Sequence, residues 1–368
     1  MEEISGLNFT IKRENILSAL SCISGIVERR NVIDALSCVQ IKASQNTVTL
    51  TASDLDISII ASLEAQIFTT GEVKVSAHMA YDIIRKLPIG LDVEFRLSNT
   101  KLSITCGNSS FSVPVVTAGK IFPIEEDHFI FNFELPAADF FNFLTKIKFA
   151  MSADDARYNL NGVYIHSYKQ TLCCVATDGH RLSSAKIKQK IEDDFGVIVP
   201  RKAVTEVLKV LDEKHNLIIK LSQTKIQFEC SQYILTSKLV DGTFPDYEKI
   251  IPADEGMSLV IDSSKFADAI DRVSVVILDK VKPIKFFLKN NELILHSVSS
   301  DSNYATESLE VEYNGKELEI GFNSRYLLEV LSCIKGKCEL IFYDENSAML
   351  IKDRDSKSFL HLVMPMRI

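Results

Sequence analysis

The stretch ATDGHRLS (176–183) places a carboxylate and an imidazole two residues apart, between the hydroxyl groups of Thr177 and Ser183. Residues of these types perform general acid–base and nucleophilic catalysis in hydrolases. The chain has no G-x-S-x-G elbow, however, and a histidine that follows its aspartate through an Asp-Gly turn is poorly placed to be oriented by it. We therefore expect a turn between two strands here. A hydrolase that uses Asp178 and His180 is the alternative hypothesis.

Other patterns of catalytic or cofactor-binding residues are missing from the sequence. It contains neither a P-loop nor a G-x-G-x-x-G motif. The seven histidines never fall in H-x-x-x-H spacing, and the eight cysteines form no C-x-x-C pair. The acid pairs Asp154-Asp155 and Asp193-Asp194 are consecutive and point apart, which is typical of solvated loop residues. The sequence therefore predicts no enzyme activity, no metal, no cofactor, and reduced thiols that are mostly buried.

The elements that would position the 176–183 stretch occur three times along the chain. A strand followed by a helix is predicted in EVKVSAHMAYDIIRKL (72–87), GVIVPRKAVTEVLKVL (196–211) and LEIGFNSRYLLEVLSCI (318–334). Another apolar helix is predicted to begin near Arg13, near Ala137 and near Ser263. Short runs of alternating apolar and polar residues lie between the helices and predict antiparallel strands.

These repeats predict an α+β fold with three copies of one domain, each with two helices packed on antiparallel sheets. Proline, glycine and acidic residues cluster at the boundaries, so the predicted domains are 1–126, 127–254 and 255–368. Three copies are too few for an open solenoid, and closure into a ring by two chains is the more natural arrangement. The alternative is a scaffold of three repeats that forms no ring and has the molar mass of one chain.

Charge is distributed unevenly along the chain. The net charge is −8, which by itself argues against nucleic acid as a partner. Five of the six predicted helical segments are nevertheless net positive, and only 262–273 is net negative. If the helices shared one surface, it would attract phosphates through exchangeable contacts with the DNA backbone. An ordinary solvated helix face is the simpler alternative.

The two ends of the chain differ in character. The first residues, MEEISG, are acidic, and no run of 18 apolar residues occurs, so we expect a cytoplasmic protein without a membrane span. The last residues, LVMPMRI, are apolar, although chain ends are usually polar and frayed. We predict that Val363 ends the last strand and that residues 364–368 line an exposed groove, because methionine adapts to several partners.

Five segments together resemble the bacterial DNA sliding clamps, the beta subunits of DNA polymerase III. The segments are ATDGHRLS, VIVPRKAV, TSKLVDGTFPDY, EIGFNSRYLLEVL and VMPMRI. They lie in the second and third repeats, and the triplication covers the rest of the chain. The resemblance implies a head-to-tail homodimer of three-domain protomers, with helices lining the hole of a six-domain ring. The basic helices would face duplex DNA, and the acidic sheets would keep DNA off the outside.

The resemblance also implies three sets of site residues. A hydrophobic cleft for partner peptides would comprise Leu160, Thr177, Gly179, His180, Arg181, Leu182, Pro245, Lys249, Ile250, Val363, Met364, Pro365, Met366 and Arg367. At the end of the tail, Ile368 replaces the more usual leucine and conserves its volume. DNA would be contacted by Arg30, Arg85, Arg157, Tyr158 and Lys202, with Lys12 as a further candidate. The dimer interface would join Phe111 and Val113 of the first domain to Val275 and Val276 of the third.

By the same resemblance the protein is a processivity factor without a catalytic step. It would encircle duplex DNA without sequence specificity and tether the polymerase III catalytic subunit by raising its effective concentration. Its other partners would be an ATP-driven clamp-loader complex and further polymerases and repair proteins that carry clamp-binding peptides, and it would not bind membranes. The segment 30–36 departs from the family pattern, and His78 and Met79 replace a common basic residue, which predicts weaker DNA contact through the first domain.

Overall fold

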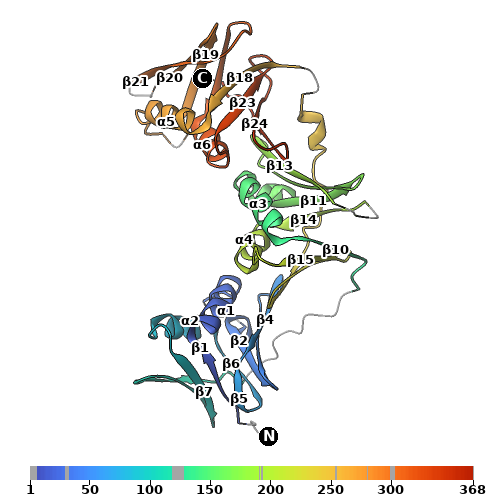
Figure 1. Cartoon of the computed structure of the whole chain (residues 1–368), viewed down its shortest axis with the longest axis vertical. Helices are drawn as coiled ribbons and strands as arrows, with labels where there is room; N and C mark the ends of the chain where they lie inside the picture. The colour runs from blue at the N-terminus through green and yellow to red at the C-terminus, as the bar shows by residue number, and fades with distance from the viewer. Residues whose placement is uncertain are drawn as a thin grey trace. The chain divides into compact units, whose positions relative to one another are not determined.

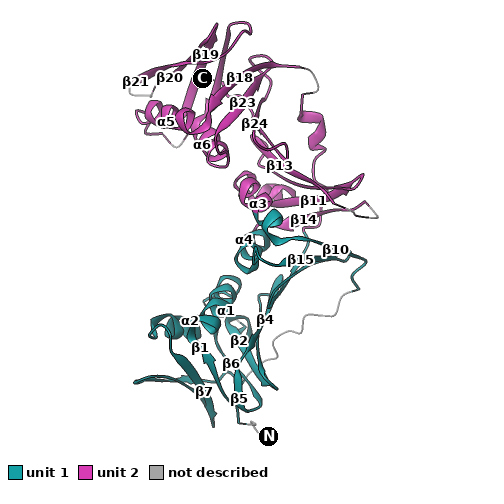
Figure 2. Cartoon of the chain, in the orientation of Figure 1, with its two compact units in different colours: residues 1–141, 202–239 teal, residues 142–201, 240–368 magenta. Residues whose placement is uncertain are grey.

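The structure is a computed structural model that describes residues 6–29, 33–117, 128–189, 191, 194–252, 255–279, 281–298 and 303–367. The predicted domain boundaries, after residues 126 and 254, fall on residues outside this part of the chain. The chain forms two compact units (Figure 2). Unit 1 consists of Met1–Phe141 and Lys202–Leu239, and unit 2 consists of Asn142–Arg201 and Val240–Ile368.

Unit 1 contains two antiparallel sheets. The five-stranded sheet has the order β5 (Gln66–Thr69), β1 (Asn8–Lys12), β7 (Asp92–Ser98), β8 (Lys101–Cys106) and β9 (Ser109–Pro114). The eight-stranded sheet has the order β10 (Phe131–Pro136), β15 (Asn216–Leu221), β16 (Lys225–Cys230), β17 (Tyr233–Lys238), β4 (Ile57–Glu64), β3 (Thr47–Ser53), β2 (Cys38–Ser44) and β6 (Gly71–Ser76). Its helical elements are α1 (Arg13–Ile26), the 3-10 turn η1 (Asp34–Ser37), α2 (Ala77–Lys86) and nearly all of α4 (Arg201–Val210). Helix α3 (Ala137–Ile147) continues into unit 2.

Unit 2 is built in the same way. Its eight-stranded sheet has the order β14 (Gly196–Pro200), β11 (Gly162–Tyr168), β12 (Thr171–Thr177), β13 (Arg181–Lys188), β25 (Phe359–Val363), β24 (Met349–Asp353), β23 (Lys337–Phe342) and β18 (Met257–Asp262). The four-stranded sheet has the order β21 (Tyr304–Glu310), β20 (Glu292–Val298), β19 (Pro283–Lys289) and β22 (Leu318–Asn323). Its helical elements are α5 (Ser263–Ser274), α6 (Ser324–Leu331), η2 (Lys148–Ala150), η3 (Asp155–Leu160) and η4 (Tyr247–Ile250).

Each eight-stranded sheet is continuous across two repeats (Figure 1). In unit 1 the pairing runs from Ile57↔Ser237 to Ala61↔Tyr233, and we call this the β4–β17 junction. In unit 2 it runs from Arg181↔Val363 to Ala185↔Phe359, and we call this the β13–β25 junction. Both junctions join the same two strands of the repeat in antiparallel register. They therefore provide two copies of one arrangement with different side chains.

The predicted helix starts are confirmed at Arg13, Ala137 and Ser263. Helices α2, α4 and α6 each follow a strand, as the three predicted strand-helix segments require. Polar side chains cap several helices at the first turn, where backbone N–H groups lack partners. The Asp262 carboxylate accepts from the Lys265 N–H at 3.0 Å, and the Asn323 side chain accepts from the Arg325 N–H at 3.1 Å.

The core of the third repeat lies between its helices and one face of its strands. Phe286 of β19 contacts Phe266 of α5 and Phe322 of β22, with ring centroids 5.8 and 5.2 Å apart. Val363 is fully buried in this core, which confirms that it ends the last strand. Each such side chain contributes roughly 1.5–3 kcal/mol by leaving water. Within the described residues, no helix is long and apolar enough to span a bilayer.

Candidate functional site

The connection from β12 to β13 is a turn held by Asp178, as the sequence predicts. Its Oδ1 atom accepts from the backbone N–H groups of His180 and Arg181 at 2.9 and 3.0 Å. Gly179 has φ of 85°, a left-handed conformation that favours glycine. Asp54 forms the same turn in unit 1, where Oδ1 accepts from the N–H groups of Asp56 and Ile57. An aspartate that repeats at a position without a histidine shapes the backbone and is not a partner for general acid–base catalysis.

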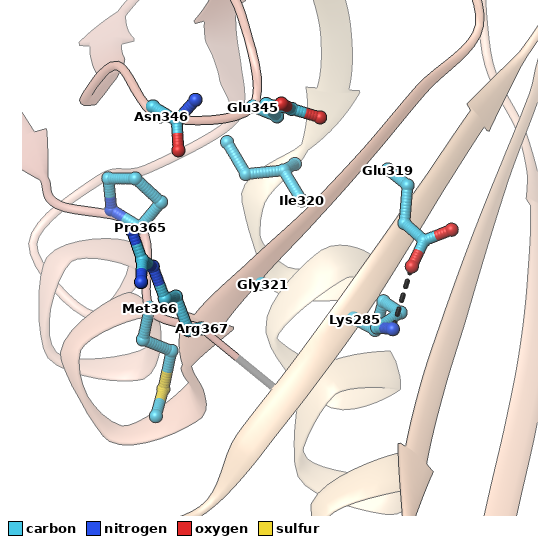
Figure 3. Close-up of a pocket in the computed structure, with 9 residues that line it drawn as sticks. All are labelled: Lys285, Glu319, Ile320, Gly321, Glu345, Asn346, Pro365, Met366 and Arg367. Carbon is cyan, nitrogen blue, oxygen red and sulfur yellow. Dashed lines mark ion pairs between the residues drawn. The ribbon is translucent and has the colours of Figure 1, made fainter.

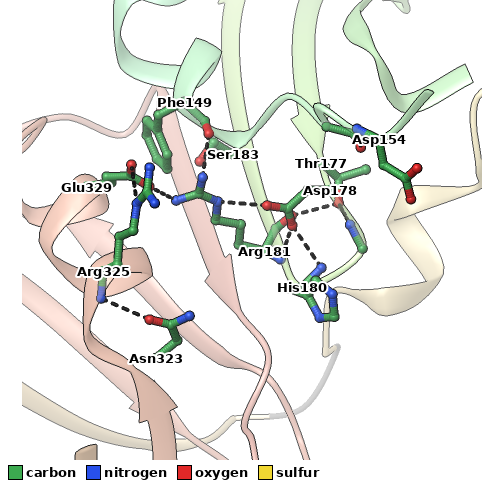
Figure 4. A network of polar contacts seen from close by, with 12 residues as sticks. Phe149, Asp154, Thr177, Asp178, His180, Arg181, Ser183, Asn323, Arg325 and Glu329 are labelled. Atoms are coloured by element: carbon green, nitrogen blue, oxygen red, sulfur yellow. Dashed lines mark hydrogen bonds and ion pairs between the residues drawn. The ribbon is translucent and has the colours of Figure 1, made fainter. Parts of the chain in front are cut away.

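Arg181 fixes this turn from the helix side of the sheet (Figure 4). Its Nε donates to the Asp178 carboxylate at 3.1 Å, and its other nitrogens donate to the Glu329 carboxylate and to the Phe149 carbonyl. The guanidinium lies over the rings of Phe149 and Tyr326, 5.1 and 4.5 Å from their centroids. Arg181 is buried. It therefore positions the turn and does not present its charge to solvent.

The opposite face of the β13–β25 junction, which we call the outer face, is apolar. Register pairing places Leu182, Leu362, Leu350 and Ile341 in one row across four strands. All four are buried, and they cluster with Leu160, Val175, Ile198, Phe244, Tyr247 and Ala348. Of these cluster residues, only Leu160 and Leu182 were predicted from the sequence as part of the cleft. The others were missed because the row exists only once the strands are in register.

The C-terminal tail lies between the turn and β22. The Met364 N–H donates to the His180 carbonyl at 2.8 Å, and the Met366 N–H donates to the Gly321 carbonyl at 2.8 Å. Met364 is 38% exposed, and Ile368 lies outside the described residues. Pro365, Met366 and Arg367 line a cavity of about 360 Å³ together with Lys285, Glu319, Ile320, Gly321, Glu345 and Asn346 (Figure 3). The tail thus forms one wall of a hollow whose other lining residues come from β19, β22 and the loop before β24, and none of them belongs to the 177–182 turn.

The remaining predicted cleft residues lie nearby in unit 2. Pro245 lines a cavity of about 630 Å³ with Tyr164, Phe244 and Tyr247, whose apolar cluster it extends. Lys249 is exposed and pairs with Asp246 at 2.8 Å, and Ile250 is 47% exposed. The Thr177 hydroxyl is buried and bonded to the Arg181 carbonyl.

Tyr326 is a neighbour of the turn that the sequence prediction missed. Its ring stacks on that of His180, with centroids 6.3 Å apart. Burial, followed by the negative charge of Asp178, raises the pKa of the Tyr326 hydroxyl. This hydroxyl therefore stays neutral and does not act as a base near neutral pH. The His180 ring is held by stacking, and both oxygens of Asp178 are engaged elsewhere, so the hydrolase hypothesis has no geometry to support it.

The predicted DNA-contacting residues are divided between the two units. Arg157 and Tyr158 lie in η3 of unit 2, where Arg157 pairs with Asp154 at 3.1 Å and donates to the Asp178 carbonyl at 2.8 Å. In unit 1, Arg85 pairs with Asp82 at 2.8 Å. The Lys202 ammonium donates to the Ile26 carbonyl at 2.7 Å and to the Asp54 carboxylate at 2.5 Å. Arg30 lies outside the described residues.

The structure also describes Lys12, the further candidate for DNA contact, and His78 and Met79, which replace a common basic residue. Lys12 is exposed, the His78 ring bonds to the Val27 carbonyl at 2.9 Å, and Met79 is 46% exposed.

The predicted interface residues lie in an edge strand and directly after a helix. Phe111 and Val113 belong to β9, the last strand of the five-stranded sheet in the described chain. Val275 and Val276 follow α5, and Val275 is 68% exposed. Strand β21 is likewise the last strand of its sheet among the described strands, and Tyr304 within it is 73% exposed. Two sheet edges are thus left for pairing, with Phe111 half-buried and Val113 buried on the β9 edge.

In the described residues, no group of three or more histidine, cysteine or acidic side chains is arranged to hold a metal ion. Seven of the eight cysteines are buried, and Cys333 is half-buried. Burial raises the pKa of the Cys174 and Cys338 thiols, which keeps these groups protonated and unreactive.

Comparisons with known proteins match the whole chain. Three family models of the DNA polymerase III beta subunit match in order: the N-terminal domain over residues 7–124, the central domain over 134–246 and the C-terminal domain over 248–367. The beta sliding clamp of Caulobacter vibrioides is 35% identical over 98% of this chain and 100% of its own. That of Escherichia coli K12 is 32% identical over the same shares. The crystal structure of the sliding clamp from Pseudomonas aeruginosa bound to griselimycin superposes with a TM-score of 0.94 at 34% identity, over 99% of this chain and 100% of the other.

Proposed function

The chain belongs to the DNA polymerase III beta-subunit family, the bacterial sliding clamps, and from this premise we propose that its partners bind in the cleft on the outer face of unit 2. The protein is a DNA polymerase processivity factor and not an enzyme. The proposal concerns where that function resides in this chain. It assigns the cleft to Leu160, Thr177, Gly179, His180, Leu182, Pro245, Lys249, Ile250 and the tail from Met364 to Arg367. The two other predicted cleft residues, Arg181 and Val363, are buried on the helix side of the sheet and would support the cleft from behind.

The apolar row of the β13–β25 junction carries this proposal. The row itself is buried in one cluster with Phe244 and Tyr247, and apolar side chains meet water at the predicted cleft residues Ile250 and Met364, which are 47% and 38% exposed. Exposed apolar surface bordered by polar groups marks a binding site. The Asp178 turn and the tail meet at the same end of β13 and β25, where the Met364 N–H donates to the His180 carbonyl, and a second backbone hydrogen bond to Gly321 fixes the tail. A short peptide with leucine and phenylalanine anchors would bury those side chains against the row.

A labelled Gln-Leu-Ser-Leu-Phe peptide tests the cleft by fluorescence polarization. We expect saturable binding to the intact chain and loss of about 100-fold or more in affinity when the chain ends after Val363, because the tail wall is then missing. Gel filtration of the truncated chain is the control, and an unchanged dimer shows that the fold persists. Equal binding by both chains would show that the tail is not part of the site. Absence of binding by either chain would refute the cleft.

The same structure supports a head-to-tail dimer. Strands β9 and β21 correspond by repeat position to the pairs that meet at the two junctions, and each is the last described strand of its sheet. We propose that β9 of one chain pairs with β21 of a second chain, so that six repeats close into a ring. Carrying the junction register onto these strands places Ser110 opposite Thr306 and Phe111 opposite Ala305. In this ring each chain would contribute three domains, 1–126, 127–254 and 255–368.

A designed disulfide tests this register. Residues directly opposite in antiparallel strands are close enough for an S–S bond, whereas residues four positions out of register are not. We expect Ser110→Cys combined with Thr306→Cys to give a covalent dimer on a non-reducing gel after mild oxidation. Ser110→Cys combined with Glu310→Cys is the control and should stay monomeric on the gel. Crosslinking of the control pair alone would show a different register.

The basic helices complete the proposal. A ring that slides needs mobile phosphate contacts without base recognition, and net positive helices in an acidic chain provide them. Of the predicted contacts, Lys202 and Arg85 are held by carboxylates in the free protein, so phosphate would replace Asp54 and Asp82 as their partners. The sequence has no nucleotide-binding motif, so opening the ring falls to a separate ATP-driven loader. We place the protein in the cytoplasm with the replication enzymes.

A further inference from the structure

A second hollow lies on the outer face of unit 2, beyond the apolar row. It has a volume of about 550 Å³ and is lined by Ser184, Lys186, Glu339, Lys352, Asp353, Arg354, Ser356, Lys357, Ser358, Phe359 and Leu360. Leu360 also packs against the apolar cluster of the cleft. The hollow and the cleft therefore share a border on one continuous sheet face.

The charges around this hollow are strongly one-sided. Lys186, Lys352, Arg354 and Lys357 are all exposed, and no ion pair joins them to a described residue. Asp353 is turned to the helix side, where its carboxylate lies 3.7 Å from the Lys146 ammonium. Glu339 is thus the one carboxylate that reaches the hollow from the outer face among its lining residues. Four cations against one carboxylate, in a chain of net charge −8, form a local anion-attracting surface.

The β4–β17 junction serves as an internal comparison. Following the same register, the position of Lys186 is taken by Ser62, that of Lys352 by Glu229 and that of Leu360 by Ile234. Glu229 there pairs with Lys220 at 2.5 Å. The basic surface is therefore absent from the equivalent strands of unit 1. It occurs at the junction that carries the peptide cleft.

We propose that this basic hollow binds an acidic stretch of the same partner polypeptide whose apolar anchors occupy the cleft. The inference rests on the proposed function of the cleft. Along a strand, residues two apart are separated by about 7 Å, so Leu362 of the cleft row and Ser358 of the hollow lie about 13 Å apart. About four extended residues span that distance. An anchored peptide holds its acidic neighbours at high local concentration, so even exposed ion pairs strengthen its binding.

Three labelled peptides with a common Gln-Leu-Ser-Leu-Phe core test the proposal by fluorescence polarization. One carries four acidic residues before the core, one carries them after it, and one carries neutral residues at both ends. Only one end of the bound core can point toward the hollow. We expect the peptide with its acidic residues at that end to bind about fivefold more tightly than the neutral peptide at low salt. The advantage should shrink as ionic strength rises.

A charge variant and a matched control locate the effect. The variant Lys186→Gln, Lys352→Gln and Lys357→Gln should abolish the advantage and leave the affinity of the neutral peptide unchanged. The control Lys289→Gln, Lys316→Gln and Lys335→Gln removes three exposed lysines of the same unit outside the hollow. It should keep most of the advantage, because the remaining screened charges act from farther away.

Each other result overturns the inference in a recognizable way. Equal affinities for all three peptides would refute the hollow while the cleft stands. Absence of binding by all three would refute the cleft and the inference together. Binding of a labelled oligothymidine that is lost in the charge variant, without any benefit from acidic residues, would assign the hollow to single-stranded nucleic acid.

Discussion

The two junction sheets have the same strand order and register, but the outer face is apolar in unit 2 and polar in unit 1. In unit 2 the row across the junction is Leu182, Leu362, Leu350 and Ile341. In unit 1 the corresponding row is Ser58, Thr236, Gln227 and Lys220. The Gln227 amide donates to the Thr236 hydroxyl at 3.0 Å. A polar row is therefore sufficient to hold a junction together.

This difference separates structural from functional residues. Backbone pairing and the helix-side core are common to both junctions, so they account for the fold. The apolar row, the stacked His180 and the tail occur at one junction, so the fold alone does not require them. Substitutions that copy unit 1 residues into unit 2 should therefore lower peptide affinity, or the stability of the residues that hold the cleft, without changing the fold.

The largest expected effect is that of Arg181→Ile, which copies Ile57 of unit 1. The change removes the guanidinium that neutralises Asp178 and Glu329 between two aromatic rings. Leaving these charges without their partner should lower the free energy of unfolding by about 3 kcal/mol. Urea unfolding followed by circular dichroism measures it. Arg325→Ile, which removes a 75% exposed side chain, is the control and should cost under about 1 kcal/mol. Similar losses in both would contradict the special role of Arg181.

The next effect is that of Leu362→Thr, which copies Thr236. Leu362 is 1% exposed at the centre of the apolar row, so the change should cost about 2 kcal/mol of folding free energy and at least about tenfold in peptide affinity. Fluorescence polarization under conditions in which the variant is fully folded measures the loss of peptide affinity separately from the loss of stability. Ile234→Thr makes the same type of change in unit 1 and should leave peptide affinity unaltered. Unchanged affinity in Leu362→Thr would show that the row is only structural.

A smaller effect, limited to acidic pH, comes from His361, where unit 1 has Leu235. Burial lowers the pKa of the His361 imidazole from 6.5 to about 3, and its Nδ1 lies 2.9 Å from the Ser183 hydroxyl. Between these pH values the unfolded chain binds one proton more than the folded chain. Stability should therefore fall as the pH drops below 6.5, by about 1.4 kcal/mol per pH unit from this group. Urea unfolding from pH 7 to pH 4 measures the slope. His361→Leu should flatten it, and an identical slope in the variant would exclude His361 as the cause.

The sequence predicted the local parts of this arrangement. Helix starts at Arg13, Ala137 and Ser263 follow from the apolar pattern that repeats along the chain, and the Asp178 turn follows from an Asp-Gly pair between two strands. Pairing of β13 with β25 could not be read from these patterns, because register is set by contacts between distant segments. The burial of Arg181 could not be predicted either, because the rings of Phe149 and Tyr326 that it contacts come from other elements. The resemblance supplied cleft residues, but only register shows which side of the sheet each occupies.

The smallest expected effect is the reverse copy, Ser58→Leu with Thr236→Leu and Gln227→Leu, which gives unit 1 an apolar row. In unit 1 the strand end at Lys238 is closed against the turn, since its N–H donates to the Asp56 carbonyl at 2.8 Å and its ammonium pairs with the Asp56 carboxylate at 3.0 Å. Met364 and His180 occupy these positions in unit 2, where the tail continues as a wall. We therefore expect no new peptide site, and titration should still give one peptide per chain. In a chain that ends after Val363 the peptide site of unit 2 is lost, so the same substitutions there test unit 1 alone. We expect no binding. Saturable binding there would show that an apolar row suffices and that the tail only adds affinity.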